Sequence, residues 1–93
     1  MARGAARLLV EGHVQGVGYR WWAVETAGRL GLDGWVRNRA DGSVEILAIG
    51  EAAAIEQLLQ ACGGGPPGAA VRAVRFEAAE DDGSAGFEQR ASF

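Results

Sequence analysis

A glycine-rich stretch followed by an arginine is the part of the sequence best suited to chemistry. Gly16 and Gly18 lie in an expected turn, between an apolar run and a segment with helical spacing that begins near Tyr19. The first backbone N–H groups of a helix have no partners within the helix, and the helix dipole favours negative charge there. Arg20 would add a planar guanidinium group beside those amides. The stretch therefore predicts a phosphate-binding loop in which both glycines have positive φ and allow the anion to approach the backbone closely.

Other residues with catalytic potential fit simpler roles. Cys62 is the only cysteine and lies in an expected apolar helix stripe, so we interpret it as a buried structural residue. His13 is the only histidine, and strand alternation places it opposite the core as a solvated surface residue. One thiol and one histidine argue against a structural zinc site. No serine lies at the centre of a Gly-x-Ser-x-Gly motif, which argues against serine hydrolase chemistry.

The composition fits one small domain spanning residues 1–93. The 93 residues are 48% hydrophobic and 23% charged, and no apolar run approaches the roughly 18 residues of a membrane span. A net charge of -3 without a basic block argues against a nucleic-acid partner. We expect a cytoplasmic monomer, because the N-terminus lacks the apolar run of a secretory signal and nothing in the sequence requires a second copy.

The candidate functional residues must be positioned by helices and strands, and the spacing of hydrophobic residues predicts where these elements lie. Strands are expected over 7–13, 34–40, 43–49 and 71–79, a short final strand near 87–92, and helices over 19–30 and 51–62. Glycines and prolines over 63–68 indicate a loop. The order βαββαβ with an extra C-terminal strand predicts an α+β ferredoxin-like sandwich, in which a mainly antiparallel sheet has both helices on one face.

Three details of the sheet follow from local patterns. Asp41-Gly42 is typical of a two-residue type I′ turn, which would make the strands over 34–40 and 43–49 antiparallel neighbours. Apolar residues on both faces of 43–49 predict a central strand. Right-handed crossover connections would place the first and third strands side by side and parallel.

The second strand separates one candidate residue from its charged neighbours. Asn38 shares the expected inner face with Val36. Trp35, Arg37 and Arg39 fall on the opposite face, and we interpret them as surface residues rather than substrate contacts. Asn38 is therefore the residue of this strand that we expect to reach a site beside the helices.

Two longer motifs carry a family resemblance. The first is Gly12-x-Val14-Gln15-Gly16-Val17-x-Tyr19-Arg20, and the second is Gly34-Trp35-Val36-Arg37-Asn38 followed by Gly42-x-Val44 and Gly50. Both resemble signatures of the acylphosphatase family, and the resemblance is clear over 7–78 and looser in the final strand. The departures are His13, where arginine is common, and Trp21-Trp22, where one aromatic residue is usual. The second departure lies at the edge of the expected pocket.

The resemblance implies hydrolysis of an acyl phosphate to a carboxylate and inorganic phosphate, without a metal or cofactor. It matches Arg20 to the phosphate-binding arginine and Asn38 to the catalytic asparagine that holds the attacking water. The matched phosphate cradle consists of the backbone amides of Gln15, Gly16, Val17, Gly18 and Tyr19. Asn38 suits the role, because an amide can orient water and stay neutral beside a dianion, which an aspartate would repel. We expect so small a loop to leave the acyl group largely in solvent.

Two other functions fit the same fold. A ferredoxin-like sandwich can serve as a non-catalytic phosphate- or ligand-binding module, although the pairing of Arg20 with Asn38 disfavours that interpretation. The chain also resembles the acylphosphatase-like domain of hydrogenase-maturation carbamoyltransferases, whose ligand is carbamoyl phosphate. Because the sequence ends without the cysteine-rich zinc modules expected downstream, we expect a stand-alone enzyme that acts on a small molecule.

Overall fold

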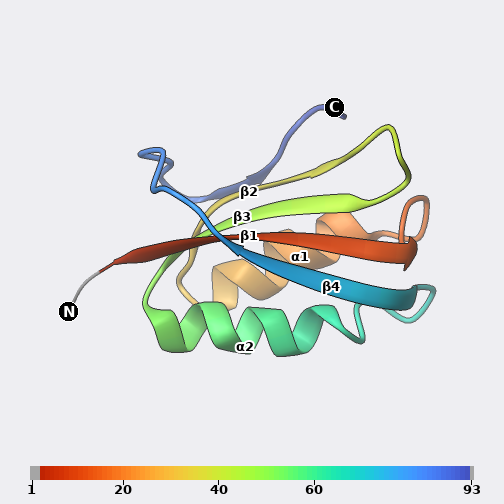
Figure 1. The fold of residues 1–93 in the computed structure, drawn as a ribbon, viewed down its shortest axis with the longest axis horizontal. Helices are drawn as coiled ribbons and strands as arrows, with labels where there is room; N and C mark the ends of the chain where they lie inside the picture. The colour runs from red at the N-terminus through yellow and green to blue at the C-terminus, as the bar shows by residue number, and fades with distance from the viewer. Residues whose placement is uncertain (1–2, 93) are drawn as a thin grey trace.

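One five-stranded sheet and two helices make up the computed structural model, which describes residues 3–92 (Figure 1). In chain order the elements are β1 (Gly4–His13), α1 (Tyr19–Arg29), β2 (Asp33–Asn38), β3 (Val44–Gly50), α2 (Ala52–Cys62), β4 (Ala70–Ala78) and β5 (Phe87–Gln89). The predicted element order, the short final strand and the ferredoxin-like α+β architecture are confirmed.

The strand order in the sheet is β4-β1-β3-β2-β5, so β3 is central, as its apolar residues on both faces predict. β5 runs parallel to β2, and the other three pairings are antiparallel. The prediction that β1 and β3 are parallel was wrong, because the two strands are neighbours but antiparallel. The crossover through α1 makes β1 parallel to β2 instead, and the hairpin then returns β3 into the gap between them.

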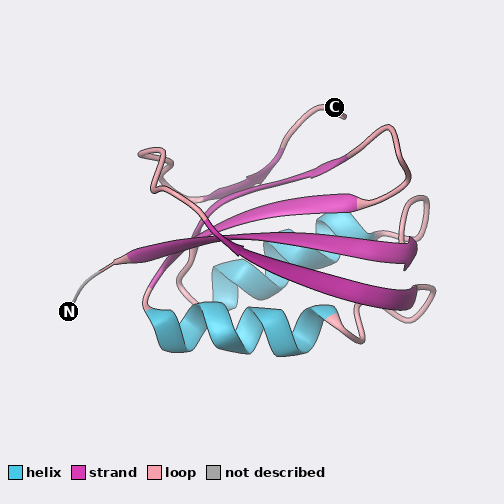
Figure 2. Ribbon diagram, in the orientation of Figure 1, coloured by secondary structure: helices cyan, strands magenta, loops and turns pink. Residues whose placement is uncertain are grey.

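Both helices cover one face of the sheet, and the main core lies between the two layers (Figure 2). Leu8 and Ile46 from the sheet and Leu58 from α2 are fully buried there. Each such side chain contributes about 1.5–3 kcal/mol relative to an exposed one. Neither helix of the described chain is long and apolar enough to cross a membrane.

Trp35 is buried, although it lies on the face of β2 that the sequence predicted to be exposed. It is only 7% exposed and belongs to a small apolar cluster outside the main core. Its indole N–H donates to Asp82 at 3.1 Å, and the guanidinium groups of Arg37 and Arg90 lie 4.9 and 5.1 Å from its ring centroid. These partners include residues far along the chain, so strand alternation alone could not predict that the indole is covered.

The hairpin between β2 and β3 differs from the predicted two-residue type I′ turn. Arg39 N–H donates to Ser43 O at 2.9 Å and Gly42 N–H donates to Arg39 O at 3.1 Å, which closes a loop over 40–42. Among the residues described, only glycines have positive φ, so Asp41 does not occupy a type I′ position, whereas Gly42 has φ 92°. The Asp41 carboxylate instead accepts hydrogen bonds from the N–H and hydroxyl of Ser43, at 2.9 and 2.6 Å, which stabilise the longer loop.

Candidate active site

A pocket of about 220 Å³ lies where the glycine-rich loop between β1 and α1 meets the end of β2. It is lined by Val14, Gly16, Gly18, Tyr19, Arg20, Trp21, Asn38 and Gln89. Arg20 and Asn38 come from different elements, yet they line the same pocket as the two loop glycines. Two members of the predicted loop, Gln15 and Val17, are not among the lining residues.

The turn that enters α1 depends on two glycines in the left-handed region, as predicted. Gly16 has φ 76° and Gly18 has φ 83°. A Cβ atom at either position would meet no protein atom within 4 Å, so the need for glycine comes from the backbone conformation rather than from crowding inside the protein. The open side of this turn leaves room for a ligand next to the backbone.

The backbone of this turn presents unpaired donors. No N–H group from Gln15 to Trp21 donates a hydrogen bond of ordinary geometry to any residue within 3–92. The N-cap of α1 is Gly18, which supplies no side-chain cap, and the first turn contains no acidic residue. The positive end of the helix dipole therefore faces the loop uncompensated. Arg20 lies in this first turn and forms no ion pair with another part of the described chain.

Gln15 connects the loop to the hairpin that follows Asn38. Its side-chain amide donates to the carbonyl oxygens of Arg39 and Ser43, at 2.8 and 2.9 Å. Both amide hydrogens are thus used within the protein, and the side chain joins the loop to the end of β2. The sequence predicted Gln15 as a loop residue, but no local pattern indicated this link.

Asn38 is the last residue of β2 and is half-buried. It shares the helix-covered face with Val36, as strand alternation predicts. The arginines on either side extend to the other face, where the Glu45 carboxylate lies 2.7 Å from Arg37 Nε and 3.7 Å from Arg39 Nη1. The Glu45 side chain is only 3% exposed, so the ion pairs anchor the backbone on both sides of Asn38.

Tyr19 and Cys62 are engaged in packing rather than poised for reaction. The Tyr19 hydroxyl donates to the backbone carbonyl of Cys62 at 2.8 Å, and burial raises the pKa of the phenol. Burial also raises the pKa of the Cys62 thiol to about 11, and the residue has no exposed surface. Neither group ionises readily near neutral pH, so the structural interpretation of Cys62 is confirmed.

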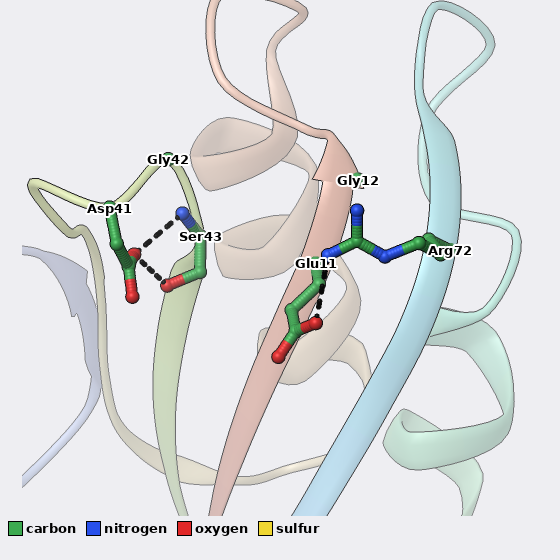
Figure 3. Close-up of a pocket in the computed structure, with 6 residues that line it drawn as sticks. All are labelled: Glu11, Gly12, Asp41, Gly42, Ser43 and Arg72. Atoms are coloured by element: carbon green, nitrogen blue, oxygen red, sulfur yellow. Dashed lines mark hydrogen bonds and ion pairs between the residues drawn. The ribbon is translucent and has the colours of Figure 1, made fainter.

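A larger hollow, of about 350 Å³, lies between the hairpin and β4 (Figure 3). Its charged groups already have partners: Arg72 Nη2 is 2.9 Å from Glu11 Oε1, and the Asp41 carboxylate accepts from Ser43. Two carboxylates and one paired guanidinium group suit an anion less well than unpaired amides and Arg20 do. Among residues 3–92, no three His, Cys, Asp or Glu side chains gather as a metal site.

Gln89 is a pocket residue that sequence reasoning missed. It is the last residue of β5, and it pairs with Val36 across the parallel β2–β5 contact, close to the end of β2 where Asn38 lies. Trp21 was expected only at the edge of the pocket, and it does line it. A three-residue strand has too short a pattern to reveal its neighbour.

Comparisons with known proteins agree with one another. The chain matches the family model described as Acylphosphatase over residues 6–89. An acylphosphatase of Acidiphilium cryptum is 51% identical over 88 residues, which cover 95% of this chain and 97% of that protein. A solved structure of an acylphosphatase from Coxiella burnetii has a TM-score of 0.91 and 36% identity, covering 95% of this chain and 93% of that one. Full-length HypF, in a phosphate- and nucleotide-bound form, has a TM-score of 0.91 at 25% identity, covering 98% of this chain and 12% of that one.

Proposed function

Because this chain belongs to the acylphosphatase family and is an acylphosphatase in function, we propose that it hydrolyses acyl phosphates in the pocket at the end of β2. Arg20 and the amides of 15–19 hold the phosphate, and Asn38 orients the attacking water. The observation that supports this assignment is that Arg20 and Asn38 line one pocket of about 220 Å³ beside the unpaired loop amides.

The phosphate is held by three sources of positive potential. Loop N–H groups donate to its oxygens, the N-terminus of α1 adds the helix dipole, and the guanidinium fork of Arg20 binds two oxygens together. Negative charge spreads over the phosphoryl oxygens as the transition state forms, so donors that are already in place stabilise that state. Removing one such donor typically slows a reaction about 10²- to 10³-fold.

Asn38 places the nucleophile without adding charge. The water oxygen forms a bond to phosphorus while the bond from phosphorus to the acyl oxygen breaks, and the carboxylate leaves with that electron pair. A phosphate oxygen of the substrate takes the proton from the water, so the reaction needs no strong protein base. Because the carboxylate is already a good leaving group, positioning and charge stabilisation provide most of the catalysis.

The proposal also covers the oligomeric state, the location and the partners of the protein. It acts as a single-domain cytoplasmic monomer on a small-molecule acyl phosphate, with no metal, cofactor, nucleic acid or membrane partner. The net charge of -3 and the absence of a basic block in the sequence support the lack of a nucleic-acid partner. Full turnover in the presence of a chelator and a monomeric mass by light scattering are the expected results, and loss of activity with chelator would contradict this part of the proposal.

Two alternatives make different predictions. A non-catalytic binding module would bind phosphate through Arg20 without turning over any acyl phosphate. A carbamoyl phosphate enzyme, which the resemblance to hydrogenase-maturation carbamoyltransferases implies, would prefer that substrate. The higher identity to an acylphosphatase favours the acyl phosphate.

Hydrolysis of acetyl phosphate by Arg20→Ala tests the assignment. Arg29→Ala is the matched control, because Arg29 lies in the last turn of the same helix and does not line the pocket. We expect Arg20→Ala to lose about 10²-fold or more in kcat/KM while circular dichroism shows an unchanged fold, and Arg29→Ala to retain wild-type activity. A folded Arg20→Ala protein with unchanged turnover contradicts the assignment.

The position of attack has its own test. In ¹⁸O-labelled water, attack at phosphorus puts the label into inorganic phosphate. Label in the carboxylate instead would show attack at the acyl carbon and would contradict the role given to Asn38.

A further inference from the structure

We propose that Trp21 binds the acyl group of the substrate, and that the enzyme therefore prefers acyl phosphates with flat, uncharged acyl groups over those with small or charged ones. The inference rests on the proposed function of the pocket. Its starting observation is that Trp21 lines this pocket although 64% of the residue is exposed.

The position of Trp21 next to Arg20 places it beside the bound substrate. Both residues lie in the first turn of α1 and line the same pocket. In an acyl phosphate only one oxygen separates phosphorus from the acyl carbon, so the acyl group must begin where the phosphate contacts end. When Arg20 and the loop hold the phosphate, the indole offers the acyl group a large exposed apolar surface, because Val14 and Tyr19, which also line the pocket, are each only 1% exposed.

Trp21 differs from the other two tryptophans in the interactions that its indole makes within the described chain. The neighbouring Trp22 packs on Tyr19, with ring centroids 5.1 Å apart, and contacts the main core. Trp35 is buried and donates a hydrogen bond to Asp82. Within residues 3–92, Trp21 makes neither a ring contact nor a side-chain hydrogen bond. The indole is therefore free to stack against a ligand.

The charge of the pocket determines which acyl groups fit. Arg20 is the single charged residue among those lining the pocket in the described chain, and the phosphate occupies it. The other side chains that line the pocket are apolar or neutral, including the Trp21 indole and the Gln89 amide. A second carboxylate or phosphate on the acyl group would find no second cation, whereas a flat apolar group can stack on the indole. An aromatic acyl group is both flat and uncharged, so it fits the pocket on both counts.

Benzoyl phosphate and acetyl phosphate separate these contributions, because they share the phosphate and differ in the acyl group. We expect the wild-type protein to have a higher kcat/KM for benzoyl phosphate, and Trp21→Ala to reduce the ratio of the two kcat/KM values about 10-fold. Trp21→Phe should restore most of the ratio because it keeps a flat ring. Phe76→Ala is the control, since Phe76 is also exposed, at 55%, but lines a separate hollow between β1 and α2.

The outcomes distinguish this inference from the proposed function. An unchanged ratio of the two kcat/KM values in Trp21→Ala overturns the inference. If both values fall by the same factor, Trp21 acts on the phosphate site rather than on the acyl group. Failure of the proposed function would appear differently, as insensitivity of both substrates to Arg20→Ala. Succinyl phosphate provides a second readout: a kcat/KM equal to or above that of benzoyl phosphate would contradict the exclusion of charged acyl groups.

Discussion

Replacing Gln15 by methionine should separate phosphate binding from turnover. The substitution keeps the length of the side chain and removes the two hydrogen bonds, of 2.8 and 2.9 Å, that join the loop to the hairpin. Both acceptors keep another partner, because Arg39 O still accepts from Gly42 N–H and Ser43 O still accepts from Arg39 N–H. No carbonyl is left unpaired, so the free energy of unfolding should fall only by the net value of two hydrogen bonds, about 1–3 kcal/mol.

The effect on activity should be larger than the effect on phosphate affinity. Gln15 joins the loop to the hairpin next to Asn38, so its loss lets the two parts of the site shift relative to each other. A misplacement of about 1 Å can cost about 10²-fold in rate. Arg20 and the loop amides belong to one continuous segment and move together. We therefore expect kcat to fall about 10- to 100-fold and the inhibition constant of inorganic phosphate to change by less than about 3-fold.

The assay is steady-state hydrolysis of acetyl phosphate with phosphate as a competitive inhibitor, together with urea unfolding. Gln60→Met is the matched control, because the Gln60 amide makes an exposed hydrogen bond to Glu56 on α2. The control should keep wild-type kcat. A Gln15→Met protein with unchanged kcat and weakened phosphate inhibition would refute the reasoning, since Gln15 would then be a phosphate contact rather than a link between two parts of the site.

Three further predictions concern stability and reactivity. Gly34→Ala should abolish folding, because its Cβ would lie 1.8 Å from a backbone oxygen of β3. The Cβ of Gly42→Ala would meet no atom within 4 Å, so this variant should lower the free energy of unfolding by only about 1–2 kcal/mol, because of its φ of 92°. Urea unfolding of the two variants compares these effects. Cys62 should resist alkylation at about pH 8 until the protein is denatured, because burial raises its thiol pKa to about 11; rapid labelling of the native protein would contradict this. Hydrogen bonds from Ser84 lower the pKa of Asp82. The stabilisation from these hydrogen bonds is present above the pKa of Asp82 in the unfolded chain, and it is lost as the pH falls through the pKa of Asp82 in the folded protein. Asp82→Asn should therefore be less stable than wild type at about pH 7. In denaturation curves, the difference in stability between the two proteins should shrink below about pH 4.

Strong local patterns explain what could be predicted of the fold and the site. The helical spacing after Tyr19 and the period-two alternation around Val36 are repeated signals, so the elements and the inward side of Asn38 could be predicted. The glycines at 16 and 18 indicated positive φ because few other residues adopt it. These features place Arg20 and Asn38 on the same side of one sheet.

The features that were missed depend on contacts between distant segments. Asp41-Gly42 favours a two-residue turn, but the Asp41 carboxylate accepts hydrogen bonds from Ser43 and so stabilises a longer loop. Gln89 reaches the pocket through a short parallel pairing with β2, which no sequence period reveals. Trp35 is buried by residues of the segment after β4, whose path depends on the completed sheet. Each outcome depends on tertiary structure that strand alternation and turn propensity do not describe.

The central claim is that Asn38 acts on the water while the loop and Arg20 hold the phosphate. The most direct measurement compares kcat for acetyl phosphate with the inhibition constant of inorganic phosphate in Asn38→Ala. We expect kcat to fall about 10²-fold or more, and phosphate inhibition to stay within a few-fold of wild type, because water is positioned mainly in the transition state. A protein that keeps its kcat at saturating substrate but loses its affinity for phosphate would contradict the account.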